Sequence, residues 1–309
     1  MDTTRNQPTV ITSPEDFLAA APGAMGFELD QSILLLGCAG PRAMHARVDL
    51  PRCSEDDAQV LQQFLPAALG NDVAAVALIV YTDDVHSAAR FTDHLLAACS
   101  REGIQVIIAL RVDRGRWYAL VDGVVGARPE GVPFDISSHP ITAQRVLEGR
   151  RVYASRAELA ASLDPDLEAV AAVERALREA RPVAGARAVR RVRSVVRRHS
   201  RSRRPPSDAL VAEVVSALAD DMTVAHIVSA MDREGAAARL EFWIGVLRRT
   251  PPAHVAQVAG VTAVAAWLAG NGALAWCAVD RSVAGGQEHP VATMVGKLLS
   301  CGVPPDVWG

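Results

Sequence analysis

Four polar side chains stand just after two consecutive apolar runs of the N-terminal half: Asp83, Asp84, Arg111 and Asp113. If the two runs are parallel strands, their carboxyl ends share one edge of a sheet, which is where open α/β sheets bind ligands. Carboxylate oxygens at such an edge suit Mg²⁺, and a planar guanidinium can hold a phosphate through two hydrogen bonds. The pattern is compatible with a metal-assisted enzyme or a ligand-binding domain acting on a phosphate-containing small molecule.

Ordinary structural roles explain the same four residues without a ligand. An Asp before a helix caps its first amides, so Asp83 or Asp84 is expected to cap the helix that follows. Asp113 precedes Arg114 and Gly115 and suits the start of a hairpin turn. We therefore assign no catalytic residue and keep the enzyme as the alternative interpretation.

Several catalytic motifs are missing from the sequence. Lys297 is the only lysine, and no Gly-x-x-x-x-Gly-Lys loop occurs, which excludes a Walker-type nucleotide site. Gly-x-Ser-x-Gly is also absent, and the eight histidines show no His-x-x-x-His or His-Glu-x-x-His spacing. The sequence thus gives no local motif for zinc.

A dense arginine run is the second candidate site, and no acidic residue occurs between Glu179 and Asp208. Its nine arginines are Arg187, Arg190, Arg191, Arg193, Arg197, Arg198, Arg201, Arg203 and Arg204. Valines recur among them at helical spacing, which predicts a helix with an apolar stripe flanked by guanidinium groups. Such a helix can bind phosphates of nucleic acid or another anionic partner, although aromatic residues for base stacking are missing.

Charge along the chain leaves a third interpretation of this run. Residues 1–165 carry a net charge of −7, residues 166–205 carry +8, and residues 206–309 carry −4. The arginines can therefore dock against the acidic segments of their own chain, or form a solvated linker. Arginine in place of lysine is typical of a GC-rich genome, so arginine content alone does not indicate nucleic-acid binding.

The elements that position these residues change in character near residue 165. Apolar runs predict a hairpin over 32–50, then a strand, a helix over 87–102 and a parallel strand over 104–110, which form a β-α-β unit. The second strand continues into another hairpin, so the sheet is mixed. Short helices follow, and from 166 onward the apolar spacing is helical throughout.

The last hundred residues divide into roughly five helices joined as hairpins. Their breaks fall at 220–221, 234–235, 250–252, 270–272 and 285–286. The segment 267–279 is weakly similar to one tetratricopeptide unit, but no second copy is found, so a hairpin bundle is the prediction. Residues 250–279 lack charge, yet Gly270-Asn271-Gly272 interrupts them, and we expect no transmembrane span.

Five cysteines without Cys-x-x-Cys spacing and a polar N-terminus without a secretory signal favour a reducing cytoplasm.

Short motifs in a fixed order carry a resemblance to a known family. They occupy residues 11–16, 26–27, 32–37, 47–49, 81–83, 111–113, 115–117, 129–131, 265–280 and 302–305. The chain resembles the actinobacterial family called domain of unknown function 4192 (DUF4192). No activity is assigned to that family, so the resemblance implies no catalytic residues.

One position departs from the family pattern. Members often have a cysteine pair before Pro-Glu-Gly, whereas Ala127 and Arg128 precede Pro129 here. A thiolate or metal role at that place is therefore not general, and the loop suits a rigid turn.

We therefore expect three parts: an α/β domain over 1–165, an arginine-rich helical connector over 166–205 and a helical-hairpin bundle over 206–309. The leading interpretation is a cytoplasmic interaction or regulatory protein with a protein partner and no assigned catalysis. Phosphate chemistry with Mg²⁺ at the sheet edge and nonspecific nucleic-acid binding through the connector are the alternatives.

Overall fold

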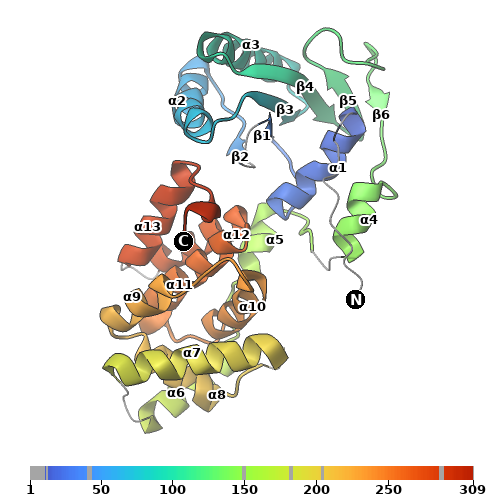
Figure 1. Ribbon diagram of the computed structural model, residues 1–309. Helices are drawn as coiled ribbons and strands as arrows, with labels where there is room; N and C mark the ends of the chain where they lie inside the picture. The colour runs from blue at the N-terminus through green and yellow to red at the C-terminus, as the bar shows by residue number, and fades with distance from the viewer. Residues whose placement is uncertain are drawn as a thin grey trace, which may run out of the picture. The chain divides into compact units, whose positions relative to one another are not determined.

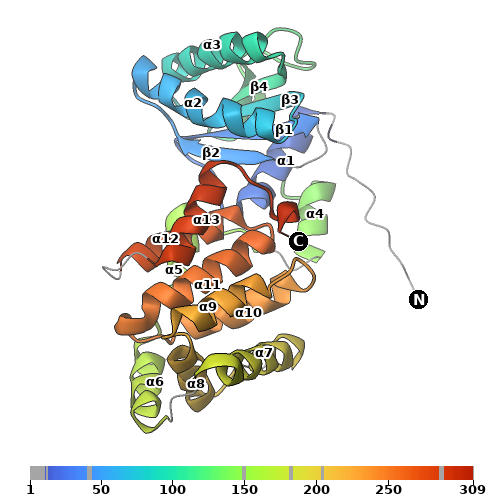
Figure 2. The same cartoon turned by 60° about the vertical axis from the view of Figure 1, so that its left-hand side comes forward.

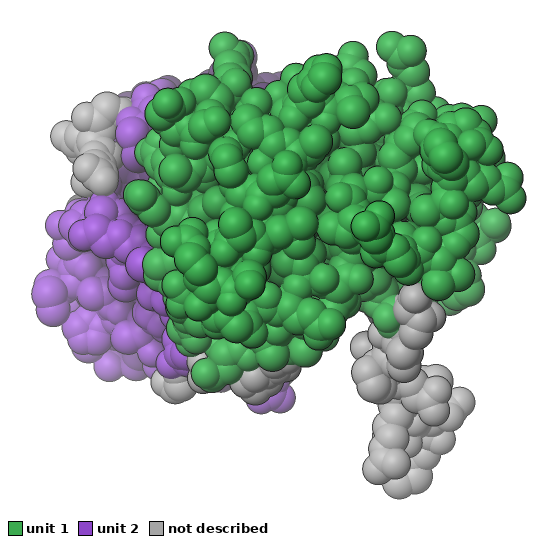
Figure 3. Space-filling view, turned by 90° about the horizontal axis from the view of Figure 1, so that it is seen from above, with its two compact units in different colours: residues 1–155 green, residues 156–309 purple. Residues whose placement is uncertain are grey.

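The chain divides into two compact units, residues 1–155 and residues 156–309, in the computed structural model (Figure 3). The structure describes residues 11, 13–39, 44–147, 151–180, 184–202, 205–284 and 289–308. The first unit contains a sheet with helices, and the described elements of the second are all helical (Figure 1). The predicted order, α/β followed by all-helical, is confirmed.

The first unit contains six strands and four α-helices among its described residues. They are α1 (Pro14–Met25), β1 (Ser32–Ala39), β2 (His45–Asp49), α2 (Ser54–Gly70), β3 (Ala75–Tyr81), α3 (Val85–Glu102), β4 (Gln105–Asp113), β5 (Arg116–Ala119), β6 (Val132–Pro133) and α4 (Pro140–Leu147). The short strand β6 directly follows the Pro129-Glu130-Gly131 loop.

The strands form one mixed sheet in the order β2-β1-β3-β4-β5-β6. Strands β3 and β4 are parallel and are joined through α3, while the other neighbours are antiparallel. The predicted β-α-β unit and both predicted hairpins are therefore confirmed. The parallel pair places the ends of β3 and β4, at Tyr81 and Asp113, at the same edge of the sheet.

The core of the first unit lies between the sheet and the pair α2 and α3. Alternate residues of β3, including Val76 and Leu78, pack with Phe64 of α2 and Phe91 of α3. Helix α1 lies on the opposite side of the sheet (Figures 1 and 2). Residues 75–80 of β3 are all buried, as the continuous apolar run predicted.

Two helices of the first unit continue past an internal proline. Helix α1 continues past Pro22 to Met25, because its end is set by Gly26, whose left-handed φ of 79° closes the last turn with a hydrogen bond to the Pro22 carbonyl. Helix α2 likewise continues through Pro66 to Gly70. An internal proline therefore does not mark the end of either helix.

The second unit is built from nine α-helices and two 3₁₀ turns among its described residues. They are α5 (Arg156–Ala161), α6 (Leu167–Glu179), α7 (Gly185–Ser202), α8 (Asp208–Ala217), α9 (Asp221–Ser229), α10 (Ala236–Leu247), η1 (Pro252–His254), α11 (Val255–Leu268), α12 (Gly272–Ala284), α13 (Pro290–Ser300) and η2 (Pro305–Val307). The break at 285–286 lies outside the described residues, and the other four breaks fall between helices as predicted.

Helix α11 is the centre of this unit and contacts α9, α10, α12 and α13 (Figure 2). Thirteen of its 14 residues are buried, which explains why its sequence is apolar on every side. It forms a hairpin with α12 through Gly270, whose φ is 75°, and Asn271, whose side chain accepts a hydrogen bond from the Leu274 amide. Within the described part of the chain, no helix has the length and apolar composition needed to cross a bilayer.

The division between the units falls after Ser155, ten residues before the predicted change of character. Helix α5 packs on α12, and Arg156 forms an ion pair with Asp280 at 2.8 Å. The chain near residue 165 is fixed to α10, because the Asp166 amide donates to the Arg248 carbonyl. Helices α6 and α7 also pack within the second unit, so the predicted connector is part of its fold.

Candidate functional site

The end of β3 places two of the four sequence-predicted residues, Asp83 and Asp84, directly before the start of α3. Asp84 is the N-cap of α3, and its Oδ1 accepts hydrogen bonds from the amides of His86 and Ser87 at 3.0 Å. These bonds, led by those from Ser87, lower the pKa of the Asp84 carboxyl. The capping role expected there is confirmed. Asp83 is exposed and accepts a 3.4 Å hydrogen bond from the Gln31 amide.

Arg111 is buried at the same edge, with 6% of its surface exposed. Its Nη1 donates to the Thr82 carbonyl at 3.0 Å, and its guanidinium lies over the Tyr118 ring at 4.0 Å from the ring centre. Asp113 lies 3.6 Å from the same Nη1. The guanidinium therefore holds the ends of β3, β4 and β5 together, and a phosphate would have to displace these internal contacts.

Asp113 also begins the hairpin between β4 and β5. The two turn residues, Arg114 and Gly115, have φ of 48° and 71°, as a two-residue type I′ turn requires. Asp113 pairs with Arg116 across this turn, so its expected hairpin role is confirmed.

The Pro-Glu-Gly loop closes over the same edge. The Arg116 guanidinium donates to the Gly131 carbonyl at 2.9 Å. Gly131 has φ of 77°, and a Cβ there would lie 2.6 Å from two ring carbons of Tyr118. Only glycine fits this backbone against the ring that covers Arg111. Several motifs that carry the family resemblance thus assemble into one rigid sheet edge.

Most of the polar residues at this sheet edge make contacts within the first unit, and they do not form an evident ligand site. Among the residues that the structure describes, no three His, Cys, Asp or Glu side chains gather as a metal site would need. Asp83 is the one predicted carboxylate of this edge that neither caps a helix nor begins a turn.

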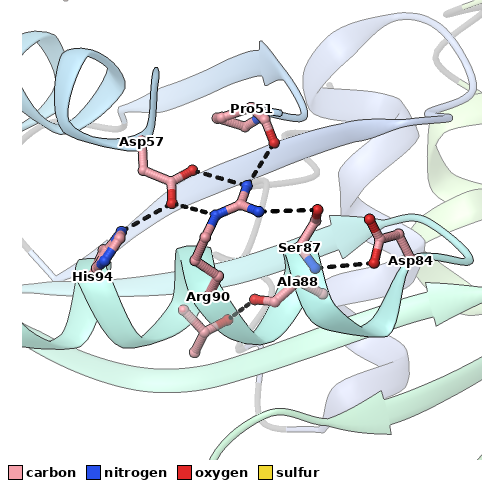
Figure 4. A network of polar contacts seen from close by, with 8 residues as sticks. Pro51, Asp57, Asp84, Ser87, Ala88, Arg90 and His94 are labelled. Atoms are coloured by element: carbon pink, nitrogen blue, oxygen red, sulfur yellow. Dashed lines mark hydrogen bonds and ion pairs between the residues drawn. The ribbon is translucent and has the colours of Figure 1, made fainter. Parts of the chain in front are cut away.

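A buried ionic cluster in the first unit was not predicted from the sequence (Figure 4). Asp57, in the first turns of α2, has a completely buried side chain. Its Oδ2 accepts from the Arg90 Nε at 2.8 Å and lies 2.9 Å from the His94 Nδ1. The Arg90 guanidinium also donates to the Pro51 carbonyl at 2.7 Å and to Ser87 at 3.2 Å.

This cluster fastens α2 and the chain before it onto α3. Arg90 and His94 are four positions apart on α3, so the sequence alone indicates that they are neighbours on the surface of this helix. Their carboxylate partner lies more than 30 residues earlier, and it stands beside two exposed acids, Glu55 and Asp56, that look equivalent in the sequence. Only the packing of α2 on α3 distinguishes Asp57.

The arginine-rich run forms helix α7, and its apolar stripe is buried. Ala188, Val192, Val195 and Val196 are between 0% and 7% exposed, and α7 contacts α8, α9 and α10. His199 lies next to Phe242 of α10, with ring centres 6.0 Å apart. The predicted helix with a valine stripe is confirmed, and the stripe docks within the second unit.

The opposite side of α7 is cationic and exposed. Arg191 is held in a bidentate ion pair with Glu213 of α8, with N···O distances of 2.6 and 2.9 Å. We define the cationic face of α7 by five further exposed arginines that form no ion pair with a described residue. They are Arg187, Arg190, Arg193, Arg197 and Arg198. Arg201 lies in the last turn of α7, and Arg203 and Arg204 lie outside the described residues.

The arrangement defines a class of protein: a mixed α/β unit joined to a helical unit that displays a cationic helix. The chain belongs to the family described as domain of unknown function (DUF4192), whose model matches residues 14–306. The match extends through both units and includes α7. No curated protein and no solved structure matches the chain.

Proposed function

We propose that the protein is a non-catalytic binding module, and that the cationic face of α7 contacts an anionic macromolecular partner. The observation that carries the proposal is five exposed arginines on one face of a helix whose other face is buried. Since the buried valines fix the helix in place, the arginines form a positioned surface, which reduces the conformational entropy lost on binding. This develops the interaction role that the sequence favoured.

Local charge supports an external partner over further docking within the chain. Helix α7 contains seven arginines and no acidic residue. Only one of its described exposed arginines, Arg191, has a carboxylate partner among the described residues. Five neighbouring positive charges on a docked helix repel one another, and an anionic partner relieves that repulsion. The five cysteines are all free, which supports a reducing, cytoplasmic setting for the complex.

Binding to a panel of soluble polyanions tests this function. Heparin, polyphosphate and polyglutamate would be titrated against the full-length protein at several salt concentrations. We expect at least one to bind, and the variant Arg190→Ala/Arg193→Ala/Arg197→Ala to bind it much more weakly.

The matched control is Arg52→Ala/Arg128→Ala/Arg233→Ala, which removes the same charge from exposed positions outside α7. An equal loss of binding in both triple variants would refute the assignment to α7, because net charge alone would then explain the effect. Absence of binding to every polyanion at low salt would refute the function itself.

A further inference from the structure

Resting on the proposed function, we infer that the partner of the cationic face of α7 is double-stranded nucleic acid, contacted along its sugar-phosphate backbone. The inference adds the class of partner and the mode of contact. Two observations support it: the exposed side of α7 is formed by arginines, and the apolar side of α7 is buried.

The burial of the valine stripe favours a nucleic-acid duplex over a membrane surface as the partner of α7. An amphipathic helix binds a lipid surface by inserting its apolar side chains among the acyl chains. Val192 and Val195 of α7 are 1% and 3% exposed, because they pack inside the second unit. The apolar side of α7 is therefore not available for insertion, and only electrostatic attraction to lipid headgroups would remain.

The composition of the exposed side of α7 favours a phosphate backbone over a protein surface as the partner. Stable protein interfaces have an apolar or aromatic core that supplies most of the affinity. The cationic face of α7 is formed by arginines, with the partly exposed Ser194 between Arg193 and Arg197. It contains no aromatic residue, so it also lacks the stacking platforms that single strands require.

The length of the arginine row fits the spacing of phosphates. Arg187 and Arg198 are 11 positions apart, which is about 17 Å along an α-helix, and the five arginines cover about 140° of its circumference. One strand of B-DNA presents a phosphate about every 3.4 Å of helix axis, so the same length holds about five. The face can therefore contact roughly three to five phosphates, and each guanidinium can bind its phosphate through two hydrogen bonds.

Fluorescence anisotropy of a labelled 20-base-pair duplex of mixed sequence with the full-length protein tests the inference. For three to five neutralised phosphates, log K is expected to fall with log salt with a slope of about −2.7 to −4.5. Between 50 and 200 mM salt the affinity should thus fall about 40-fold to 500-fold. The variant Arg190→Ala/Arg193→Ala/Arg197→Ala should flatten the slope by about 1 for each lost phosphate contact.

The control Arg52→Ala/Arg128→Ala/Arg233→Ala should leave the slope unchanged. A second duplex of unrelated sequence should bind equally, and a single strand of the same length should bind more weakly. Both triple variants should keep the wild-type circular dichroism spectrum and melting temperature, because every substituted side chain is exposed.

The failures of the inference and of the proposed function are distinguishable. Polyglutamate or anionic vesicles that bind through α7 as tightly as the duplex would overturn the partner class and leave the binding module standing. Tighter binding of the single strand than of the duplex, or a strong preference for one duplex sequence, would overturn the inference that α7 contacts the sugar-phosphate backbone. Lack of binding to the duplex and to every other polyanion would remove both.

Discussion

Replacement of Asp57 by Asn tests whether the buried ionic cluster holds the first unit together. The substitution keeps the size of the side chain but removes the charge that Arg90 and His94 share. Removing one partner of a buried ion pair costs about 3–5 kcal/mol. Arg90 and His94 are 26% and 42% exposed and can regain water, so we expect a smaller loss, about 2–3 kcal/mol.

Asp56→Asn is the matched control, because Asp56 lies in the same helical turn but is exposed. It removes the same charge near the N-terminus of α2, which is worth about 0.3–1 kcal/mol. The difference between the two variants isolates the contacts of Asp57. A larger effect of Asp57→Asn is expected on α2 and α3 and not on the second unit.

Peptide-resolved hydrogen exchange of the full-length protein measures this difference, since a chain with two units need not unfold in one step. A loss of 2–3 kcal/mol corresponds to exchange about 30-fold to 150-fold faster in peptides covering α2 and α3. If Asp57→Asn and Asp56→Asn exchange at the same rate, the cluster does not stabilise this packing and the argument fails.

Three further substitutions or reactions test other parts of the structure. Gly131→Ala should destabilise the first unit more than Gly126→Ala, because both glycines have positive φ but only a Cβ at Gly131 meets the Tyr118 ring; comparative thermal melts measure this. Because the pKa of Asp84 is lowered in the folded state, its stabilisation is full above about pH 4 and is lost as pH falls through the lowered pKa. Asp84→Asn should therefore match the wild type at pH 6 and lose less stability between pH 4 and pH 2 in denaturant titrations; a parallel loss would contradict the capping role. Burial raises the pKa of Cys99 to about 11, so this thiol should resist Ellman's reagent at pH 8 until the protein unfolds, and early reaction would show that the core is open. The exposed thiols that should react first are Cys38, Cys53 and Cys301.

Much of the fold was predictable because its signals are local. The segment that forms β3 is apolar without interruption, as is typical of a strand that is buried on both faces. Helix α3 is bounded by Asp84 and Gly103, a capping residue and a left-handed glycine, both of which are readable in the sequence. The internal Pro22 does not end α1, because Gly26 sets its end four residues later.

The candidate sites depend on contacts between residues far apart in the chain, and fewer of these contacts could be predicted from the sequence. The positions of Asp83 and Arg111 at one sheet edge followed from parallel strands, but the stacking of Arg111 on Tyr118 required knowledge of the β5 pairing. Asp57 could not be distinguished from its acidic neighbours before α2 and α3 were packed. For α7 the charge was visible, whereas its docking depended on the surfaces of α8, α9 and α10.

That docking changes how the arginines must be tested. If the arginine-rich run were a free connector, residues 187–204 could be deleted with both folded parts left intact. In the structure, deletion would expose the surfaces that Val192, Val195 and Val196 cover, at about 1.5–3 kcal/mol for each buried valine. A deleted protein that failed to bind would therefore not distinguish a lost contact surface from a disrupted second unit. Substitution of the outward arginines leaves the buried side of α7 unchanged, so a loss of binding then reports on the cationic face alone.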